Sequence, residues 1–538
     1  MYIKKIYIKN YKLFKDVVID LRPDINIFVG NNDAGKSTVL EALTILTTGK
    51  LNGFAFERQL KATLFNKDER NNYINLISKG ETIAPPKIVF EAYFDGGEEY
   101  SGSNNALGEN CAGIHIEVDL AEANEDTYKR LLKDNQITEI PVELYHVTYS
   151  YFSGCGVVYR YAPFKSILID TTRKDYSSLV DKFVADNISE HLSEEEITDL
   201  ALAYRYSRNQ FREHEIVQQL NELVRNQVVI PGRDISIDLK EETLDDWKRQ
   251  MSITVGDTPF ESVGFGTQNS IKIELVMKNA SKQANIVLLE EPENNLSYTN
   301  MSMLVRHIID SKGKQVFIST HSSYIANKLS LDNVTLLNNG VISSYSELND
   351  DTKKYFVKLP GYDTLRFALS EKVVLVEGPT DDLIIQRAYK DKYGHLPIED
   401  GIDIIVVDSL AFKRYCDIAV LMNKEVVVVT DNDGDIKKNI VEKYSDYKDN
   451  SLLTFIYEED ESLNTIEPSV LAVNSENGEP NQTFKEIISV NDSMLKKNYE
   501  EILKYMTNNK VEWAFRVFEA ENTIIYPEYI KHVIEKYS

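Results

Sequence analysis

The sequence predicts an α/β protein in which one α/β domain is followed by a second. One observation is a set of short, continuous apolar runs, which are typical of parallel strands buried on both faces. A second is a glycine-rich turn that joins an apolar run at 25–29 to a helical pattern from Ser37 to about Thr47. Strand, glycine loop and helix in that order open many nucleotide-binding domains. The apolar runs that define the two series lie at 286–289, 316–319, 373–376, 404–407 and 426–429.

The remaining elements follow from hydrophobic patterning. The N-terminal residues alternate Ile and Tyr with Lys and predict a hairpin over 3–8 and 17–21, and two more strands are expected at 87–94 and 114–120. Residues 172–227 have the pattern of charged helices. We predict that this block is a helical insertion in the first domain, with an ordinary helical subdomain of that domain as the alternative.

Composition leaves the partner open but indicates the compartment. The 538 residues carry a net charge of −25, which does not exclude nucleic acid, because metal ions can neutralise carboxylates at a phosphate. The three cysteines are widely spaced without a zinc-binding pattern, which suits a reducing compartment. No apolar run of the sequence reaches the roughly 18 residues that a membrane helix needs. We therefore expect a cytoplasmic protein without a membrane partner.

The glycine-rich turn is a phosphate-binding motif. It matches the pattern GxxxxGK[ST] in full, after a strand and before a helix. Its glycines let backbone N–H groups curl around a phosphate, Lys36 supplies a positive charge, and the Ser37 hydroxyl binds Mg²⁺. The sequence thus predicts an ATP site whose loop residues are Gly30, Asn31, Asn32, Asp33, Ala34, Gly35, Lys36, Ser37 and Thr38.

A later strand supplies the acids that such a site needs. The apolar run at 286–289 ends in Glu290 and Glu291, which Pro292 follows. One acid at a strand end can hold Mg²⁺, and the next can polarise the attacking water. We assign the first role to Glu290 and the second to Glu291.

Together these motifs resemble the ABC-type ATPases of the SMC and recombination-repair group, in which paired Walker B acids are followed by proline and another acid. Residues 262–268 resemble a degenerate ABC signature, in which Gly264 and Gly266 would approach a γ-phosphate. Residues 293–296 stand at the D-loop position and His321 at the switch position. In this group the signature loop completes the site of a second subunit, so the resemblance implies a homodimer, or a higher oligomer, with composite ATP sites.

A second group of acids follows the second series of strands. Glu377 comes directly after one apolar run and Asp381 four residues later, whereas Asp431, Asp433 and Asp435 follow another run. Parallel strands deliver such residues to one edge of a sheet. Hard oxygen ligands select Mg²⁺, Mn²⁺ or Ca²⁺, and one or two such ions can activate a water molecule against a phosphodiester.

The glutamate and the later DxD resemble the Toprim motif, and an ABC ATPase followed by Toprim resembles the OLD (overcoming lysogenisation defect) family of nucleases. The resemblance implies that Glu377 is a metal ligand or general base and that the aspartates are metal ligands. It also implies Glu467 as a second-metal ligand and Lys510 as the residue that stabilises charge on the phosphate. Relatives act in anti-phage defence, among them Gabija-type and retron-associated proteins, which implies DNA and a helicase or a reverse transcriptase–msDNA complex as partners.

The predicted organisation has four segments. Residues 1–171 and 241–368 form the ABC ATPase, 172–240 form the helical insertion with a dimerisation role, and 369–538 form the Toprim domain. The expected function is that of an ATP-regulated, metal-dependent endonuclease acting on DNA. The alternative is a repair-type ATPase whose Toprim domain binds nucleic acid or a partner without cutting. The sequence leaves open whether ATP activates or inhibits cleavage, and whether DNA or RNA is cut.

Overall fold

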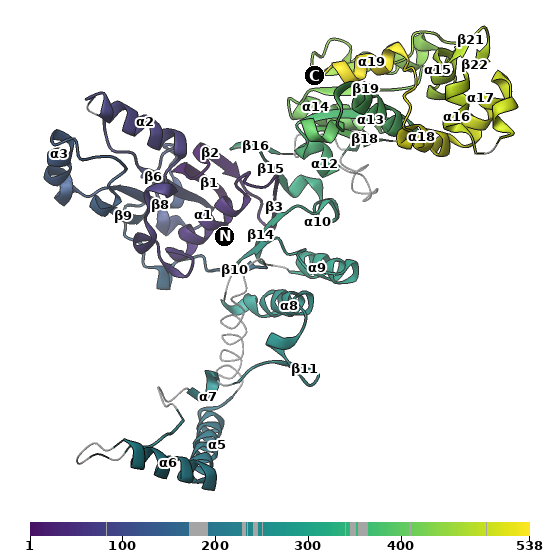
Figure 1. Ribbon diagram of the computed structural model, residues 1–538. Helices are drawn as coiled ribbons and strands as arrows, with labels where there is room; N and C mark the ends of the chain where they lie inside the picture. Colours follow the sequence, from purple (N-terminus) through teal and green to yellow (C-terminus); the bar gives the residue numbers. More distant parts are fainter. Residues whose placement is uncertain are drawn as a thin grey trace. The chain divides into compact units, whose positions relative to one another are not determined.

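The chain divides into two compact units, Met1–Tyr159 with Ser319–Ser538 and Arg160–Ile318 (Figure 1). The four-segment organisation stays a prediction, and part of its helical segment lies outside the described residues. Within the described ranges no helix is long and apolar enough to span a bilayer. The computed structural model describes residues 1–537 apart from 82, 172–191, 229–232, 234, 240–245, 250, 284, 312, 339, 345–350, 353–363, 408–410 and 491.

The first unit opens with an antiparallel sheet. Its strands, with the helices that accompany them, are β1 (Tyr2–Tyr11), β2 (Phe14–Asp20), β6 (Ile88–Asp95), β7 (Ser101–Gly102), β8 (Cys111–Leu120), β9 (Tyr145–Tyr151), α1 (Lys36–Thr48), α2 (Lys67–Ser78) and α3 (Glu125–Lys133). The strand order is β2-β1-β6-β8-β7, and β9 also pairs with β8. The predicted hairpin is confirmed, because Ile6 lies opposite Ile19 and Ile8 opposite Val17. Alternate residues point to opposite faces, so one face is a buried apolar layer against α1 and the other is polar.

The strand–loop–helix opening is confirmed. Its strand is β3 (Ile25–Gly30), which pairs in parallel with β15 (Val334–Asn338), and β15 pairs antiparallel with β16 (Val341–Ser344). The helix α1 follows the loop directly, and Gly35 precedes it with φ 104°, a left-handed conformation that favours glycine. The loop is thereby fixed between a buried strand and a helix N-terminus.

The second unit carries the acidic strand end. Strand β10 (Ser166–Asp170) pairs in parallel with β13 (Ile286–Glu290), and Asp170 lies opposite Glu290. Helix α8 (Phe265–Gln283) contacts both strands and packs against α9 (Tyr298–Asp310). The strands predicted at 286–289 and 316–319 are confirmed, the latter within β14 (Gln315–Thr320). Glu290 therefore ends a strand whose four apolar residues are buried, and Glu291 follows it.

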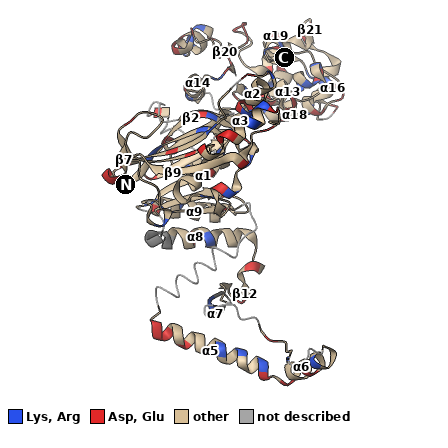
Figure 2. Cartoon of the chain, turned by 90° about the vertical axis from the view of Figure 1, so that its left-hand side faces the viewer, with Lys and Arg blue, Asp and Glu red and all other residues tan. Residues whose placement is uncertain are grey.

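The described part of the predicted helical block consists of α5 (Glu194–Glu213) and α6 (Glu215–Gln227). Ser193 and Glu196 form a capping box at the start of α5, whose first turn is acidic and whose last turn holds Arg212 (Figure 2). No residue of α5 is buried. Large apolar side chains are exposed along both helices, namely Leu200, Leu202, Tyr206, Phe211, Ile216, Leu220 and Leu223.

The C-terminal part of the first unit is a second α/β fold, green to yellow in Figure 1. Its strands are β17 (Lys372–Val376), β18 (Ile402–Val406), β19 (Val426–Val429) and β20 (Leu453–Ile456), all parallel, in the order β18-β17-β19-β20. The predicted strands at 373–376 and 426–429 are confirmed, and the one at 404–407 lies at 402–406. The helices are α12 (Thr364–Leu369), α13 (Pro379–Tyr393), α14 (Phe412–Leu421), α15 (Ile466–Val473), α16 (Gln482–Ile488), α17 (Tyr499–Asn508), α18 (Lys510–Glu519) and α19 (Glu528–Glu535). Since the strands are parallel, their carboxyl ends meet at one edge of the sheet.

Candidate nucleotide and metal sites

The predicted phosphate loop is shaped by close backbone contacts. A Cβ atom at Gly30 would overlap the carbonyl oxygen of Leu337, so this position requires glycine. The Lys36 ammonium donates to the carbonyl oxygens of Gly30 at 2.9 Å and Asn31 at 3.0 Å. The lysine therefore lies within the loop, at the N-terminus of α1, where backbone N–H groups favour an anion. Of the other predicted loop residues, the exposed ones are Asn32, Asp33 and Ser37, and the buried ones are Ala34, Gly35 and Thr38.

Glu290 and Glu291 stand at the end of β13. The Thr171 hydroxyl donates to their carbonyl oxygens at 3.1 Å and 2.6 Å and fixes this turn, in which Glu291 has φ 43°. The Asn294 amide donates to Glu291 Oε2 at 3.0 Å, so the carboxylate predicted to polarise water has a fixed direction. Neither Thr171 nor Asn294 was predicted individually as a functional residue. In the sequence only their positions could have indicated them. Thr171 directly follows the strand that pairs with β13, and Asn294 lies inside the predicted D-loop.

The predicted signature and D-loop contact each other within the second unit. A Cβ atom at Gly266 would overlap the carbonyl oxygen of Asn295, whereas one at Gly264 would meet open space. The buried Asn269 donates from Nδ2 to the carbonyl oxygen of Asn294 at 3.2 Å. Gly266 is thus required for packing inside the chain, and Gly264 is the signature glycine with room beside it.

His321 is the first residue after β14 and is exposed, whereas Ser319 and Thr320 before it are fully buried. The Thr320 hydroxyl accepts a hydrogen bond from the Ser322 N–H at 2.9 Å, which turns the chain at this point. The predicted switch residue therefore presents its imidazole at the end of a buried strand.

Carboxylates also gather at the carboxyl edge of the C-terminal sheet. Glu377 Oε1 accepts hydrogen bonds from the Thr430 hydroxyl at 2.6 Å and the Asp431 N–H at 3.2 Å, which joins the ends of β17 and β19. Asp381, in the first turn of α13, accepts from the Gly378 N–H at 3.1 Å. We call this group the acidic edge, and its members are Glu377, Asp381, Asp431 and Glu467.

The members of the acidic edge oppose one another's ionisation. Burial, and next the charge of Glu377, raises the pKa of Asp381 to about 7. Burial, and next the charges of Asp381 and Glu377, raises the pKa of Asp431 to about 8. On α19, burial and the nearby Asp381 and Asp431 raise the pKa of Tyr529 well above its usual value, so its phenol stays protonated. Tyr529 was not predicted, because its place near the acids depends on how the C-terminal helix packs.

Lys510 brings a positive charge to the acidic edge. Its ammonium lies 3.6 Å from Glu467 Oε1, a buried atom that accepts no hydrogen bond from the described residues. The Thr465 hydroxyl donates to the other oxygen of Glu467 at 2.7 Å. The Lys510 side chain is 54% exposed, whereas that of Glu467 is 1% exposed. The two residues that were expected only from the family resemblance therefore lie together.

Asp433 and Asp435 are exposed, unlike the members of the acidic edge. Asp433 has φ 49°, and Asp435 Oδ1 accepts from the Lys438 N–H at 2.9 Å at the start of a π-helical turn (Lys437–Glu442). Across the described ranges no three His, Cys, Asp or Glu side chains form a ready-made metal cluster. The acidic edge still fits a divalent cation, because its donors are hard oxygens that repel one another and one buried oxygen of Glu467 has no hydrogen-bond donor among the residues that the structure describes.

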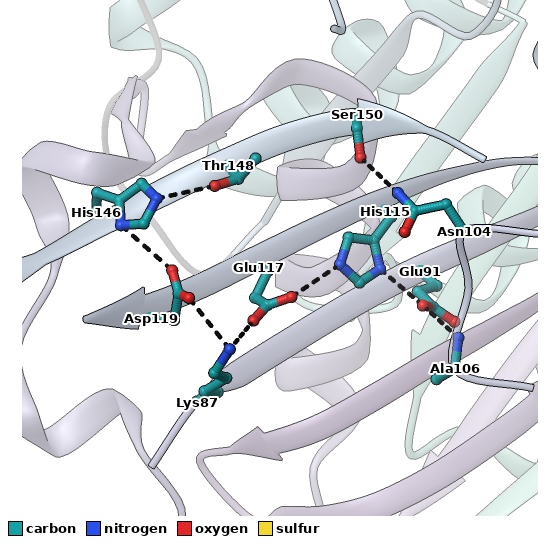
Figure 3. Close-up of polar contacts among 10 residues, drawn as sticks. All are labelled: Lys87, Glu91, Asn104, Ala106, His115, Glu117, Asp119, His146, Thr148 and Ser150. Carbon is teal, nitrogen blue, oxygen red and sulfur yellow. Dashed lines mark hydrogen bonds and ion pairs between the residues drawn. The ribbon is translucent and has the colours of Figure 1, made fainter. Parts of the chain in front are cut away.

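A second group of acids, which the sequence analysis missed, lies on the polar face of the antiparallel sheet (Figure 3). His115 contacts Glu91 Oε1 through Nδ1 at 2.7 Å and Glu117 Oε2 through Nε2 at 3.2 Å. The Lys87 ammonium contacts Glu117 at 2.5 Å and Asp119 at 3.1 Å, and His146 contacts Asp119 at 3.2 Å. We call this group the sheet network, and its members are Lys87, Glu91, His115, Glu117, Asp119 and His146.

The sheet network borders an open hollow of about 660 Å³. Burial lowers the pKa of His115, but hydrogen bonds with Glu117 and Glu91 outweigh it and raise that pKa to about 9. The hydrogen bond from His115 in turn lowers the pKa of Glu117 to about 2. Strand register creates this network, because Glu91 lies opposite His115 and Asp119 opposite His146.

Two family models match the chain. The model described as AAA ATPase domain matches residues 1–152 and 166–326. The model described as overcoming lysogenization defect protein-like, TOPRIM domain, matches residues 369–433. Together they confirm the predicted fold class, an ABC-type ATPase followed by a Toprim α/β domain.

Curated relatives match a short part of the chain. The DNA replication and repair protein RecF of Clostridium botulinum is 34% identical over 83 residues, which are 15% of this chain and 22% of the relative. RecF of Clostridium acetobutylicum is 33% identical over 79 residues, 15% of this chain and 21% of the relative. The chain therefore spans about a fifth of the length of these relatives.

Solved structures overlap more of the chain at lower identity. The SMC head domain from Thermotoga maritima covers 64% of this chain and is itself covered to 97%, with 15% identity and a TM-score of 0.31. A structure of the recombination mediator protein RecF with ATPrS covers 64% and is covered to 98%, with 11% identity and a TM-score of 0.32.

Proposed function

This chain belongs to the AAA ATPase domain family and carries a Toprim domain of the overcoming-lysogenization-defect type, and from that premise we propose that it is an ATP-regulated, metal-dependent endonuclease that hydrolyses DNA phosphodiesters. The acidic edge carries this proposal. Four carboxylates gather at the carboxyl edge of the parallel sheet, and one of them, Glu467, forms an ion pair with Lys510. Such an excess of negative charge is characteristic of sites that hold divalent metal ions.

In this proposed function the residues of the acidic edge have different roles. Mg²⁺, or Mn²⁺ or Ca²⁺, would be held by Glu377, Asp381, Asp431 and Glu467, with Asp433 and Asp435 as outer ligands. Such ions activate water and offset charge on the phosphate when bound. Glu377 is oriented by the Thr430 hydroxyl for service as ligand or general base. Lys510, half exposed beside Glu467, is placed to stabilise charge developing on the phosphate.

The ATPase half supplies the regulation. In this proposal the loop residues 30–38 bind the phosphates of ATP, and Ser37 with Glu290 holds its Mg²⁺. Glu291, fixed by Asn294, orients the attacking water, and His321 contacts the γ-phosphate. Gly264 and Gly266 belong to the signature loop that serves a second subunit.

We also propose that the active form is a homodimer. The chain holds one phosphate loop and one signature loop, so composite sites need two copies. The exposed apolar side chains of α5 and α6 offer a surface that a second copy would cover. This supports the dimerisation role of the helical segment. Higher oligomers remain compatible with the same surface.

The wider setting of the proposal is anti-phage defence in the cytoplasm. The cysteines Cys111, Cys155 and Cys416 are free, which suits a reducing compartment. A helicase or a reverse transcriptase–msDNA complex would be the partner that controls cutting. ATP would act through the dimer, as activator or as inhibitor.

The deciding experiment is plasmid cleavage by the full chain with Mg²⁺ or Mn²⁺, with and without ATP. We expect the wild type to cut, and Glu377→Ala and Asp431→Ala to cut at least about 100-fold more slowly. Asp446→Asn is the matched control, because Asp446 is an exposed acid of the same domain, paired with Lys413. It should cut as the wild type does.

Two outcomes contradict the proposal in different ways. If both acidic-edge variants cut at the wild-type rate, the site lies elsewhere. If the wild type cuts under no metal or nucleotide condition but hydrolyses ATP and binds DNA, the chain is a repair-type ATPase with a binding Toprim domain. The likeness to RecF over 83 residues favours that second candidate.

A further inference from the structure

Asn432 separates the two aspartates of the DxD motif and is almost fully buried, with 1% of its surface exposed. Its amide group is completely engaged by the backbone. Nδ2 donates to the carbonyl oxygens of Glu458 at 2.8 Å and Asp460 at 3.1 Å, and Oδ1 accepts from the Gly434 N–H at 2.8 Å. A buried side chain with three such bonds has a single orientation.

The backbone of Asn432 also forms hydrogen bonds. Its carbonyl oxygen accepts from the Asp435 N–H at 3.0 Å and from Asn439 Nδ2 at 3.1 Å. The next two residues, Asp433 and Gly434, have φ 49° and 75°, so the chain reverses immediately after Asn432. This reversal leaves Asp431 half-buried beside Glu377 and exposes Asp433. Asn432 is thus hydrogen-bonded to the turn that separates the half-buried Asp431 from the exposed Asp433.

The same amide joins two separate loops. One is the loop after β19, which carries Asp431, and the other is the connector 458–465 after β20, which leads to Glu467. The Asp433 N–H adds a bond to the Asn464 carbonyl oxygen at 3.3 Å, and the Ile436 N–H adds one to Glu461 Oε1 at 3.0 Å. The Ile436 bond is exposed, whereas the three Asn432 bonds are partly buried. The Asn432 amide thus links the loop that carries Asp431 to the connector that leads to Glu467.

The chemistry of the position requires an amide. An aspartate has the same shape but no donor, so its oxygen would face two carbonyl oxygens and add a charge beside the acidic edge. An alanine would remove all three bonds and leave the two carbonyl groups without their partner. A serine can keep one bond because its hydroxyl both donates and accepts.

We propose that Asn432 is a positioning residue that connects the loop after β19 to the connector after β20 through its hydrogen bonds. This connection holds Asp431 and Glu467 at the separation that a divalent ion requires. The inference rests on the proposed metal-dependent function. It assigns to Asn432, the residue between the two aspartates of the motif, a role in metal affinity and none in direct contact with substrate.

The test uses Asn432→Ser, Asn432→Ala and Asn432→Asp in the full chain, with Mn²⁺ binding followed by electron paramagnetic resonance and plasmid cleavage followed across Mn²⁺ concentrations. Residues that orient metal ligands typically contribute about 10- to 100-fold in metal affinity. We expect Asn432→Ala to weaken Mn²⁺ binding by at least about 10-fold, with a smaller effect from serine and a larger one from aspartate. Cleavage at saturating Mn²⁺ should recover in large part for serine and alanine.

The matched control is Asn450→Ala, which removes a loop asparagine whose side chain accepts from the Leu452 N–H at 3.0 Å before β20. It should bind Mn²⁺ as the wild type does. Hydrogen exchange of the β17 and β19 amides reports that the C-terminal sheet of each variant is folded, and if Asn432→Ala loses protection there, Asn432→Ser decides the question. Wild-type Mn²⁺ affinity in all folded Asn432 variants, beside its loss in Asp431→Ala, would overturn the inference alone. A wild type that neither binds Mn²⁺ nor cuts would instead overturn the proposed function.

Discussion

The sheet network and the acidic edge both gather carboxylates, but they balance them differently. In the sheet network His115 lies between Glu91 and Glu117, Lys87 between Glu117 and Asp119, and His146 beside Asp119 (Figure 3). In the acidic edge four carboxylates face one another, and the ion pair formed there is that of Lys510 with Glu467.

The pKa values report this difference. The pKa of Glu117 is lowered to about 2 by its histidine partner, whereas the pKa of Asp431 is raised to about 8 by burial and by neighbouring acids. Charges that are neutralised within the chain serve the fold. Charges left uncompensated in a structured site mark a place where a ligand from outside supplies the missing charge.

The largest expected effect is on stability, and it is opposite in sign at the sheet network and at the acidic edge. His115→Ala should destabilise the antiparallel sheet by about 3 kcal/mol, because it leaves a fully buried Glu91 without its charged partner. Asp431→Asn, without metal, should stabilise the C-terminal sheet, because it removes a repelled charge. Hydrogen exchange of the β6 and β8 amides reports the first effect, and that of the β17 and β19 amides the second.

Each variant is the control for the other, because neither should alter exchange in the opposite sheet. Destabilisation of β17 and β19 by Asp431→Asn in metal-free buffer would contradict the contrast. It would mean that Asp431 is held by attractive contacts and that the acidic edge is a structural feature.

The sequence predicts some parts of these sites and not others, and the difference has a physical reason. The placement of the phosphate loop, Glu290 and Glu377 at strand ends was predictable, because each motif is contiguous and follows a recognisable apolar strand. The sheet network was not, because Glu91 meets His115 only through the register of β6 and β8. The exposure of Asp433 was not predicted either, because it depends on a left-handed backbone and on the buried Asn432.

A pH series sharpens the comparison. Asp431 has a pKa of about 8 in the folded chain and roughly 3.9 when unfolded, so the folded state holds an extra proton between these values and its stability falls as pH rises from 4 to 8. The advantage of Asp431→Asn over the wild type should therefore grow across this range. Hydrogen exchange of β17 and β19, corrected for intrinsic rates, measures it.

The sheet network gives the matching control. His115 has a pKa of about 9 in the folded chain and roughly 6.5 when unfolded, so its contribution is complete below pH 6.5 and is lost as pH rises through 9. The cost of His115→Gln should shrink over that window. Mg²⁺ should abolish the pH dependence at Asp431 and leave that at His115 unchanged. An equal response of both to Mg²⁺ would contradict a metal site confined to the acidic edge.

The smallest expected effect is a difference in cleavage rate between variants of two lysines, Lys87 and Lys510, whose side chains are almost equally exposed. The side chains of Lys87 and Lys510 are 53% and 54% exposed, so solvent screens both ion pairs, and Lys87→Met and Lys510→Met should each cost less than about 1 kcal/mol. Only Lys510→Met should slow plasmid cleavage, because Lys510 contacts Glu467 at the acidic edge whereas Lys87 lies in the sheet network. Cleavage rates at saturating Mn²⁺ decide between them. An equal loss in both variants would show that Lys510 acts through general charge, whereas a loss confined to Lys510→Met assigns it to the site.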